Sequence, residues 1–170
     1  MSYKKEFNKY LIELGKKNST YGGGSALCLV FCMGLSLLEK ALVFSFEDKK
    51  RISLLKKLRK KFLCLVDEDG RLFISALRAR GKRKIFLINK IQKNIINLGI
   101  SCYNIIIDFR NIEKNIKDSI KSDFYIGLDF LKLVIKGCIE NLEANSKIFK
   151  IRRSKYIDIF KNYGKDIVCQ

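Results

Sequence analysis

Residues 25–46 read SALCLVFCMGLSLLEKALVFSF, and this long apolar stretch decides the fold class. Its length is close to the roughly 20 apolar residues that span a bilayer. The charged residues Glu39 and Lys40 interrupt it, however, and small or hydroxylated residues recur along it: Ser25, Ala26, Gly34, Ser36 and Ser45. A central helix buried in a bundle fits this pattern better than a membrane span, so we expect no membrane contact.

Helical spacing continues on both sides of this stretch. Apolar residues recur every three or four positions along most of the chain, and no alternating strand pattern competes with them. The chain has no proline, a major helix breaker. We therefore predict one all-α domain over residues 1–170, a bundle of about six helices. They are expected near residues 7–14, 25–46, 47–80 (ended by Gly81), 88–109, 122–146 (capped by Ser122 and Asp123) and 156–163.

The composition narrows the chemistry further. With 35 Lys and Arg against 17 Asp and Glu, the net charge is +18, which favours anionic partners. The basic residues gather in Lys49–Lys61 and Arg78–Lys84. In the first cluster Ile52, Leu55 and Leu58 follow helical spacing, so its lysines fit the solvated side of an amphipathic helix. We favour that interpretation over an RNA or lipid site, because no aromatic residues interleave the charges.

Metal and disulfide chemistry are not expected. The chain has no histidine, which excludes a histidine base and any histidine-ligated metal. Its six cysteines form no C-x-x-C pair, and Cys28 and Cys32 lie one helical turn apart among apolar residues, where reduced cysteines act as core residues. No secretory signal precedes them. We expect a reducing, cytoplasmic location and neither a metal nor a cofactor.

Three glycines, Gly22, Gly23 and Gly24, precede the apolar stretch directly. At the start of a helix their backbone N–H groups are exposed at the positive end of the helix dipole and can cradle an anion or a polar ring. The sequence matches neither of the glycine-rich nucleotide motifs. Taken alone, this composition favours a flexible turn.

Asp69 is the second candidate for a functional site, after the three glycines. Residues three and four positions apart share a helical face, and the neighbours of Asp69 at these distances are all apolar: Leu65, Val66, Leu72 and Phe73. We therefore expect a buried carboxylate with a raised pKa, which is suited to general acid or base catalysis. A structural carboxylate paired with a lysine explains the spacing equally well.

The third candidate is the segment Ser122–Asn145. One helical face carries Asp123, Gly127, Leu131, Val134, Cys138, Asn141 and Asn145. The two amides on this otherwise small or apolar face could hydrogen-bond a flat heteroaromatic ligand or a partner helix. Taken alone, the pattern favours contact between helices.

These three segments together resemble the formiminotransferase-cyclodeaminase C-terminal domain and its stand-alone relatives. STYGGGSALCLVFCMGLSLLE (residues 19–39) is similar to that family's opening P-[ST]-P-G-G-G-S and long helix. LCLVDEDGRLFISAL (residues 63–77) is similar to L-[VI]-D-x-D-A-x-A-F, and residues 122–145 to the S-D…G-A-x-x-N-V-x-x-N helix. Ser19 and Tyr21 stand where the family has prolines, the segment after Leu77 is shorter, and Ile116-Lys117 replaces a G-N pair.

The resemblance implies an all-helical, dimeric enzyme of folate one-carbon metabolism. Its members are formiminotetrahydrofolate cyclodeaminases or methenyltetrahydrofolate cyclohydrolases, with the folate as substrate and no further cofactor. The family's catalytic aspartate falls on Asp69. Substrate-binding positions fall on Gly22, Gly23, Gly24, Ser25, Asp123, Asn141 and Asn145. The basic surface would suit a polyglutamate tail.

An alternative function remains open at this stage. The chain could be a non-catalytic helical module that binds RNA, or an acidic protein, through its basic clusters. Nucleic acid is not the favoured partner. Charge reversal of Lys56, Lys57, Lys60 and Lys61 should abolish that function but only weaken substrate capture by an enzyme.

Overall fold

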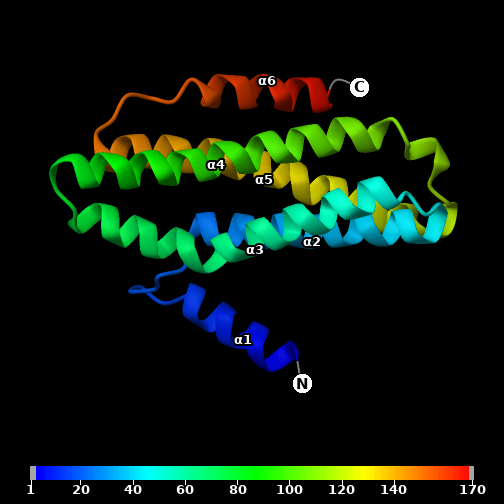
Figure 1. Cartoon of the computed structure of the whole chain (residues 1–170), viewed down its shortest axis with the longest axis horizontal. Helices are drawn as coiled ribbons and strands as arrows, with labels where there is room; N and C mark the ends of the chain where they lie inside the picture. The colour runs from blue at the N-terminus through cyan, green and yellow to red at the C-terminus, as the bar shows by residue number, and fades with distance from the viewer. Residues whose placement is uncertain (1–2, 169–170) are drawn as a thin grey trace.

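The computed structural model describes residues 3–168, and its regular secondary structure is all helical, without a strand in that range (Figure 1). Cys169 lies outside the described residues. The α-helices are α1 (Tyr3–Leu14), α2 (Gly23–Ser45), α3 (Lys49–Arg78), α4 (Gly81–Arg110), α5 (Lys121–Phe149) and α6 (Tyr156–Val168). Two short 3-10 helices, η1 (Glu113–Asn115) and η2 (Asp118–Ile120), lie in the junction before α5. The predicted all-α bundle is confirmed.

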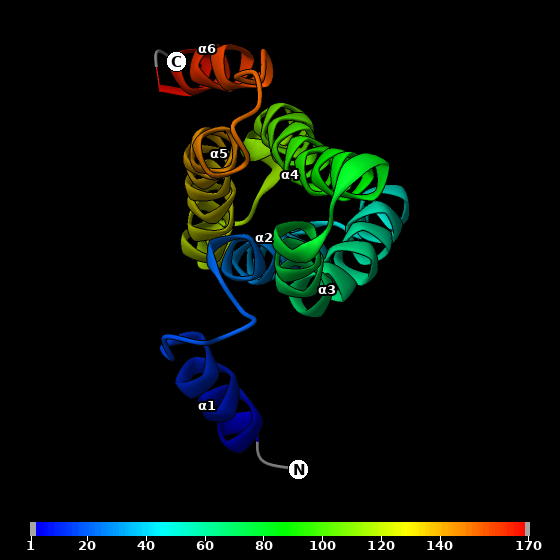
Figure 2. The ribbon, with the colours of Figure 1, turned by 90° about the vertical axis from the view of Figure 1, so that its left-hand side faces the viewer.

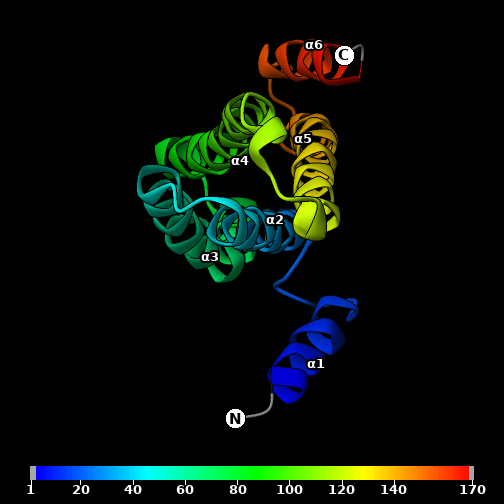
Figure 3. The ribbon, with the colours of Figure 1, turned by 90° about the vertical axis from the view of Figure 1, so that its right-hand side faces the viewer.

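Four long helices form the body of the molecule. Helix α2 packs against α3 on one side and α5 on the other, and α4 closes the bundle by packing against both α3 and α5. In the end-on views of Figures 2 and 3, α6 covers the outer side of α5, while α1 projects from the opposite side of the bundle. The pocket described below opens among the four long helices.

Helix α2 is the central helix that its apolar sequence predicts. Leu35, Leu38 and Leu42 are fully buried in the core. The helix crosses α5 closely, because a Cβ atom on Gly34 would lie only 3.0 Å from the carbonyl oxygen of Gly127. Within the described residues, α2 is also the one helix long and apolar enough to cross a membrane by length and composition.

All the predicted helices occur, although α1 begins four residues and α4 seven residues earlier than expected, and α6 ends five residues later. Asp48 caps α3 by accepting a hydrogen bond from the backbone N–H of Arg51. Gly81 separates α3 from α4 with a φ of 55°, a left-handed conformation that suits glycine. The predicted cap of α5 is wrong: the helix begins one residue earlier, and Ile120 occupies the capping position without a side-chain hydrogen bond. The carboxylate of Asp123 pairs with Lys40 instead.

The cysteines of the core behave as expected for reduced side chains. Cys28, Cys32, Cys102 and Cys138 are buried free thiols. Burial raises the pKa of Cys28 to about 12 and that of Cys32 to about 11. These thiols therefore stay neutral at physiological pH and contribute packing rather than reactivity.

Candidate active site

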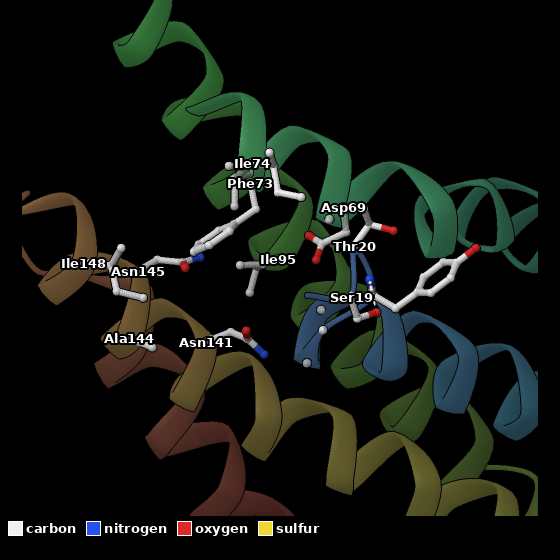
Figure 4. Close-up of a pocket in the computed structure, with 16 residues that line it drawn as sticks. Ser19, Thr20, Asp69, Phe73, Ile74, Ile95, Asn141, Ala144, Asn145 and Ile148 are labelled. Carbon is white, nitrogen blue, oxygen red and sulfur yellow. Dashed lines mark hydrogen bonds between the residues drawn. The ribbon is translucent and has the colours of Figure 1, made fainter. Parts of the chain in front are cut away.

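One pocket, about 290 Å³ in volume, brings together parts of all three segments singled out in the sequence. The Ser19–Gly24 loop forms one wall, α3 and α4 form a second, and the C-terminal half of α5 faces them (Figure 4). Its lining includes Asp69, Asn141 and Asn145 as well as the three glycines of the loop. Residues more than 100 positions apart in sequence thus share one cavity.

The Ser19–Gly24 loop is held against α3. The hydroxyl of Tyr21 donates a hydrogen bond to Asp67 over 3.0 Å, and the Tyr21 backbone N–H donates to the Ser19 hydroxyl over 2.9 Å. The loop backbone also lies against Gly70, where an added Cβ would fall 1.3 Å from the carbonyl oxygen of Thr20. The position of the loop therefore depends on the absence of a side chain at Gly70.

Asp69 projects from α3 toward the first turn of α2. An added Cβ on Gly24 would lie 2.3 Å from Oδ2 of Asp69, so Gly24 leaves room for the carboxylate. The prediction of a buried carboxylate is wrong, because the open pocket leaves Asp69 partly exposed. Desolvation nevertheless raises the pKa of Asp69. Among the described residues the carboxylate has neither a hydrogen-bond donor nor an ion-pair partner.

Two amides face this carboxylate from α5 (Figure 4). Asn141 donates a hydrogen bond to the carbonyl of Gly137, one turn back, over 3.1 Å, and its side chain lies next to Gly23. Asn145 is only 5% exposed, and no hydrogen-bond partner for its side chain lies within the described part of the chain. Because Asn145 lines the open pocket, its amide is available to donate and accept hydrogen bonds with a ligand there.

The rest of the pocket is apolar. Phe73 and Ile74 of α3, Ile91 and Ile95 of α4, and Ile148 of α5 line it. The ring of Phe73 is supported from behind by Phe149, which does not line the pocket. The two rings lie 5.4 Å apart in an edge-to-face arrangement. A cavity with an apolar wall and a few converging polar groups is the usual form of a small-molecule site.

Two of the predicted substrate-binding residues do not line the pocket. Ser25 is fully buried, and its hydroxyl donates to the carbonyl of Val66 over 2.7 Å, which ties α2 to α3. Asp123 lies at the other end of α5, paired with Lys40. Sequence reasoning also missed Gly70, although a glycine inside a helical pattern, directly after a candidate aspartate, signals a close backbone approach.

Comparison with known proteins places this chain in a family. A family model described as formiminotransferase-cyclodeaminase matches residues 6–156, a range that contains every residue lining the pocket. The chain belongs to the formiminotransferase-cyclodeaminase family. The sequence resemblance to that family is thereby confirmed.

A solved member of the same fold extends the comparison. The chain is similar to the formiminotetrahydrofolate cyclodeaminase of Thermotoga maritima, whose crystal structure was determined at 2.80 Å resolution. The TM-score is 0.77 over 99% of this chain and 89% of that one, at 15% sequence identity. At this identity the likeness establishes the cyclodeaminase fold and leaves the reaction to be argued from the pocket. No curated protein sequence matches the chain.

Proposed function

We propose that this member of the formiminotransferase-cyclodeaminase family is a folate one-carbon enzyme. Its reaction is that of a methenyltetrahydrofolate cyclohydrolase or a formiminotetrahydrofolate cyclodeaminase, with Asp69 as the general acid and base. The observation that carries the proposal is the meeting of Asp69, the glycine loop and the unpartnered amide of Asn145 in one pocket. We further propose that the protein works as a cytoplasmic homodimer without a metal or another cofactor.

The surroundings of Asp69 suit proton transfer in both reactions. In the cyclohydrolase, Asp69 takes a proton from the water that adds to the methenyl carbon and returns it to the ring nitrogen that leaves, while the second proton of that water is released to solvent as the formyl C=O forms. In the cyclodeaminase, the folate nitrogen that does not carry the formimino group attacks the formimino carbon, and Asp69 transfers the proton that this nitrogen loses to the imino nitrogen, which leaves as ammonia. A carboxyl group whose pKa is raised by desolvation is a better proton donor near neutral pH than an ordinary one.

The remaining pocket groups suit a flat, polar ring system. Asn145 and Asn141 can donate and accept hydrogen bonds along the edge of such a ring, while Phe73 and Ile95 pack against its face. The backbone of Gly22–Gly24 lies at the start of α2, where N–H groups are free to bind a ligand. We assign Ser25 and Asp123 structural rather than binding roles, since they contact Val66 and Lys40.

Absorbance spectroscopy tests the proposal directly. The purified protein is mixed with methenyltetrahydrofolate, and separately with formiminotetrahydrofolate, and the methenyl chromophore is followed against a blank without enzyme. Faster loss of the chromophore than in the blank identifies a cyclohydrolase, and its faster appearance from the formimino compound identifies a cyclodeaminase.

Two variants make the assignment of Asp69 specific. Asp69→Asn should abolish the acceleration, while Asp129→Asn, the same change at an exposed aspartate of α5 outside the pocket, should keep it. If both wild-type traces follow the blank, the protein is not a folate enzyme of either kind. The basic clusters and an anionic partner then become the leading hypothesis.

A further inference from the structure

The outward face of α2 is apolar and only partly covered in a single copy of the chain. Val30, Met33, Leu37 and Phe44 follow one another at intervals of three, four and seven residues, the spacing of a helix that packs along another helix. Met33 is 43% exposed and Phe44 is 57% exposed. Under half of the most apolar 18-residue window of α2 is buried within the chain. This face, which we call the α2 face, is thus an exposed apolar patch of the kind that marks an interaction site.

The middle of the α2 face is a groove. It has a volume of about 350 Å³ and lies between α3 and α5, lined by Cys32, Met33, Ser36, Leu37, Arg59, Leu63 and Phe130. The three cations at its border share two carboxylates: Arg59 and Lys56 both pair with Glu39, and Lys40 pairs with Asp123. Most of the charge at the border is thus paired and the lining is mainly apolar, so the groove favours an apolar helix over an anionic partner.

Helix α1 is the second uncovered apolar element, and it leaves the same side of the bundle. Figures 1 to 3 show α1 extending away from α2 toward the N-terminus. Its Phe7 and Leu11 lie one turn apart on one face, and Leu11 is 47% exposed. A helix of 12 residues is marginally stable in water by itself, so α1 needs a partner surface.

The attachment of α1 to its own bundle lies at its C-terminal end. The ring of Tyr10 packs against that of Tyr21 at 5.0 Å, and Tyr21 in turn is bonded to Asp67 of α3. This attachment directs the N-terminal turns of α1 outward rather than back across the groove. An apolar helix without a groove and an apolar groove without a helix therefore occur in the same chain.

We propose that α1 of one copy lies in the groove of the α2 face of a second copy, and that the exchange is reciprocal. A two-fold axis allows each chain to give one helix and receive one, so both apolar surfaces are covered without any other molecule. An amphipathic helix in an apolar groove is a common mode of recognition. The proposal specifies how the homodimer is built, and it does not depend on the folate reaction.

The exchange also connects the partner to the pocket. Ser19, Thr20 and Tyr21 follow α1 directly and line the pocket, and Tyr10 contacts Tyr21. When the partner fixes α1 of a copy, the Ser19–Tyr21 loop of that copy is therefore held at both ends. In a monomer this loop is held only by its contacts with α3. This link between partner and pocket rests on the proposed function, but the assembly itself is tested without any activity measurement.

Sedimentation and light scattering of the full chain provide that test. We expect the wild type at tens of micromolar to have twice the 19.7 kDa mass of one chain. Leu11→Lys on α1 and Met33→Glu in the groove should each place an unpaired charge in the interface and weaken association by at least about 100-fold. Phe86→Lys, an equally drastic change at an exposed apolar residue of α4 away from both surfaces, should stay dimeric.

Mixing the two charged variants separates helix exchange from other dimers. One interface of the mixed pair contains only wild-type residues, and in the other the new lysine of α1 meets the new glutamate of the groove. Both variants should be monomers alone and form a dimer together. A monomeric wild type, a dimer unaffected by Leu11→Lys, or variants that stay monomeric when mixed would overturn the proposal. Circular dichroism of each variant confirms that it is folded.

Discussion

Gly70→Ala is the most informative single change in this protein. Gly70 is buried in α3 beside Asp69, and a Cβ built there lies 1.3 Å from the carbonyl oxygen of Thr20 and 2.5 Å from its carbonyl carbon. The obstacle is backbone, so no side-chain rotation can relieve it. To restore an ordinary contact of 3.4 Å, the Ser19–Gly24 loop must move by about 2 Å, the difference between 3.4 and 1.3 Å.

The expected stability change is small because two effects oppose each other. Alanine favours an internal helical position over glycine by about 1 kcal/mol. Forcing an extra group into a packed site costs about 1–3 kcal/mol. The sum lies between no change and a loss of about 2 kcal/mol, which a folded domain tolerates. The reaction is more sensitive than the stability to the displacement of the loop, since a displacement of about 1 Å at a reacting centre can cost about 100-fold in rate.

The assay compares thermal or urea unfolding with turnover of the methenyl or formimino substrate. Gly70→Ala should remain folded and lose at least about 100-fold in kcat/KM. Gly99→Ala is the matched control: its Cβ would meet the Phe160 ring at 2.4 Å, outside the pocket, so it should lower stability and keep turnover per folded molecule. Wild-type kcat/KM in Gly70→Ala would refute the inference that this contact positions the loop.

Four further predictions concern charged and amide side chains. Asp69→Asn should raise the thermal stability at neutral pH, because desolvation raises the pKa of the native carboxyl and penalises its charged form. That gain should shrink as the pH falls through the raised pKa and vanish below about 3.9, as melts at several pH values would show. Asn145→Leu should keep the fold and weaken binding of a stable tetrahydrofolate by about 10-fold, measured by calorimetry. Asp123→Asn should leave kcat/KM unchanged in the absorbance assay and cost less than about 1 kcal/mol in a urea melt, since it loses only a half-exposed ion pair. Lys60→Glu combined with Lys61→Glu should raise KM at low salt without changing kcat, and the difference should disappear at high salt.

The fold could be predicted from local pattern because its helices are long and strongly periodic. The stretch around Leu35 and Leu38 is too apolar for a surface helix and too interrupted for a membrane span, which leaves the centre of a bundle. The failed prediction concerned the start of α5. Asp123 has the chemistry of a capping residue, but its ion pair with Lys40 of α2 competes for the same carboxylate.

The site could be predicted only in part, for a related reason. Helical periodicity placed Asp69 and the two amides on inward faces, and the structure brings both sets to one cavity. Periodicity describes one helix at a time, however, and cannot show that several helices leave a space between them. The same limit explains why Asp69 was expected to be buried although the open pocket exposes it. It also explains why Ser25 was taken as part of the binding loop although its hydroxyl bonds to Val66.

The glycine loop of this chain differs from the family pattern in how its backbone is held in place. The family's prolines restrict the loop backbone by themselves, whereas Ser19 and Tyr21 do not. In this chain the restriction comes from contacts: Tyr21 bonds to Asp67, Ser19 accepts from the Tyr21 backbone, and Thr20 lies against Gly70. Gly70 stands where the family pattern has alanine, and that exchange creates the space the loop occupies. A loop held by contacts is more easily displaced than one held by prolines. We therefore expect Tyr21→Phe, which removes only the hydroxyl donated to Asp67, to raise KM more than it lowers kcat, as steady-state kinetics would show.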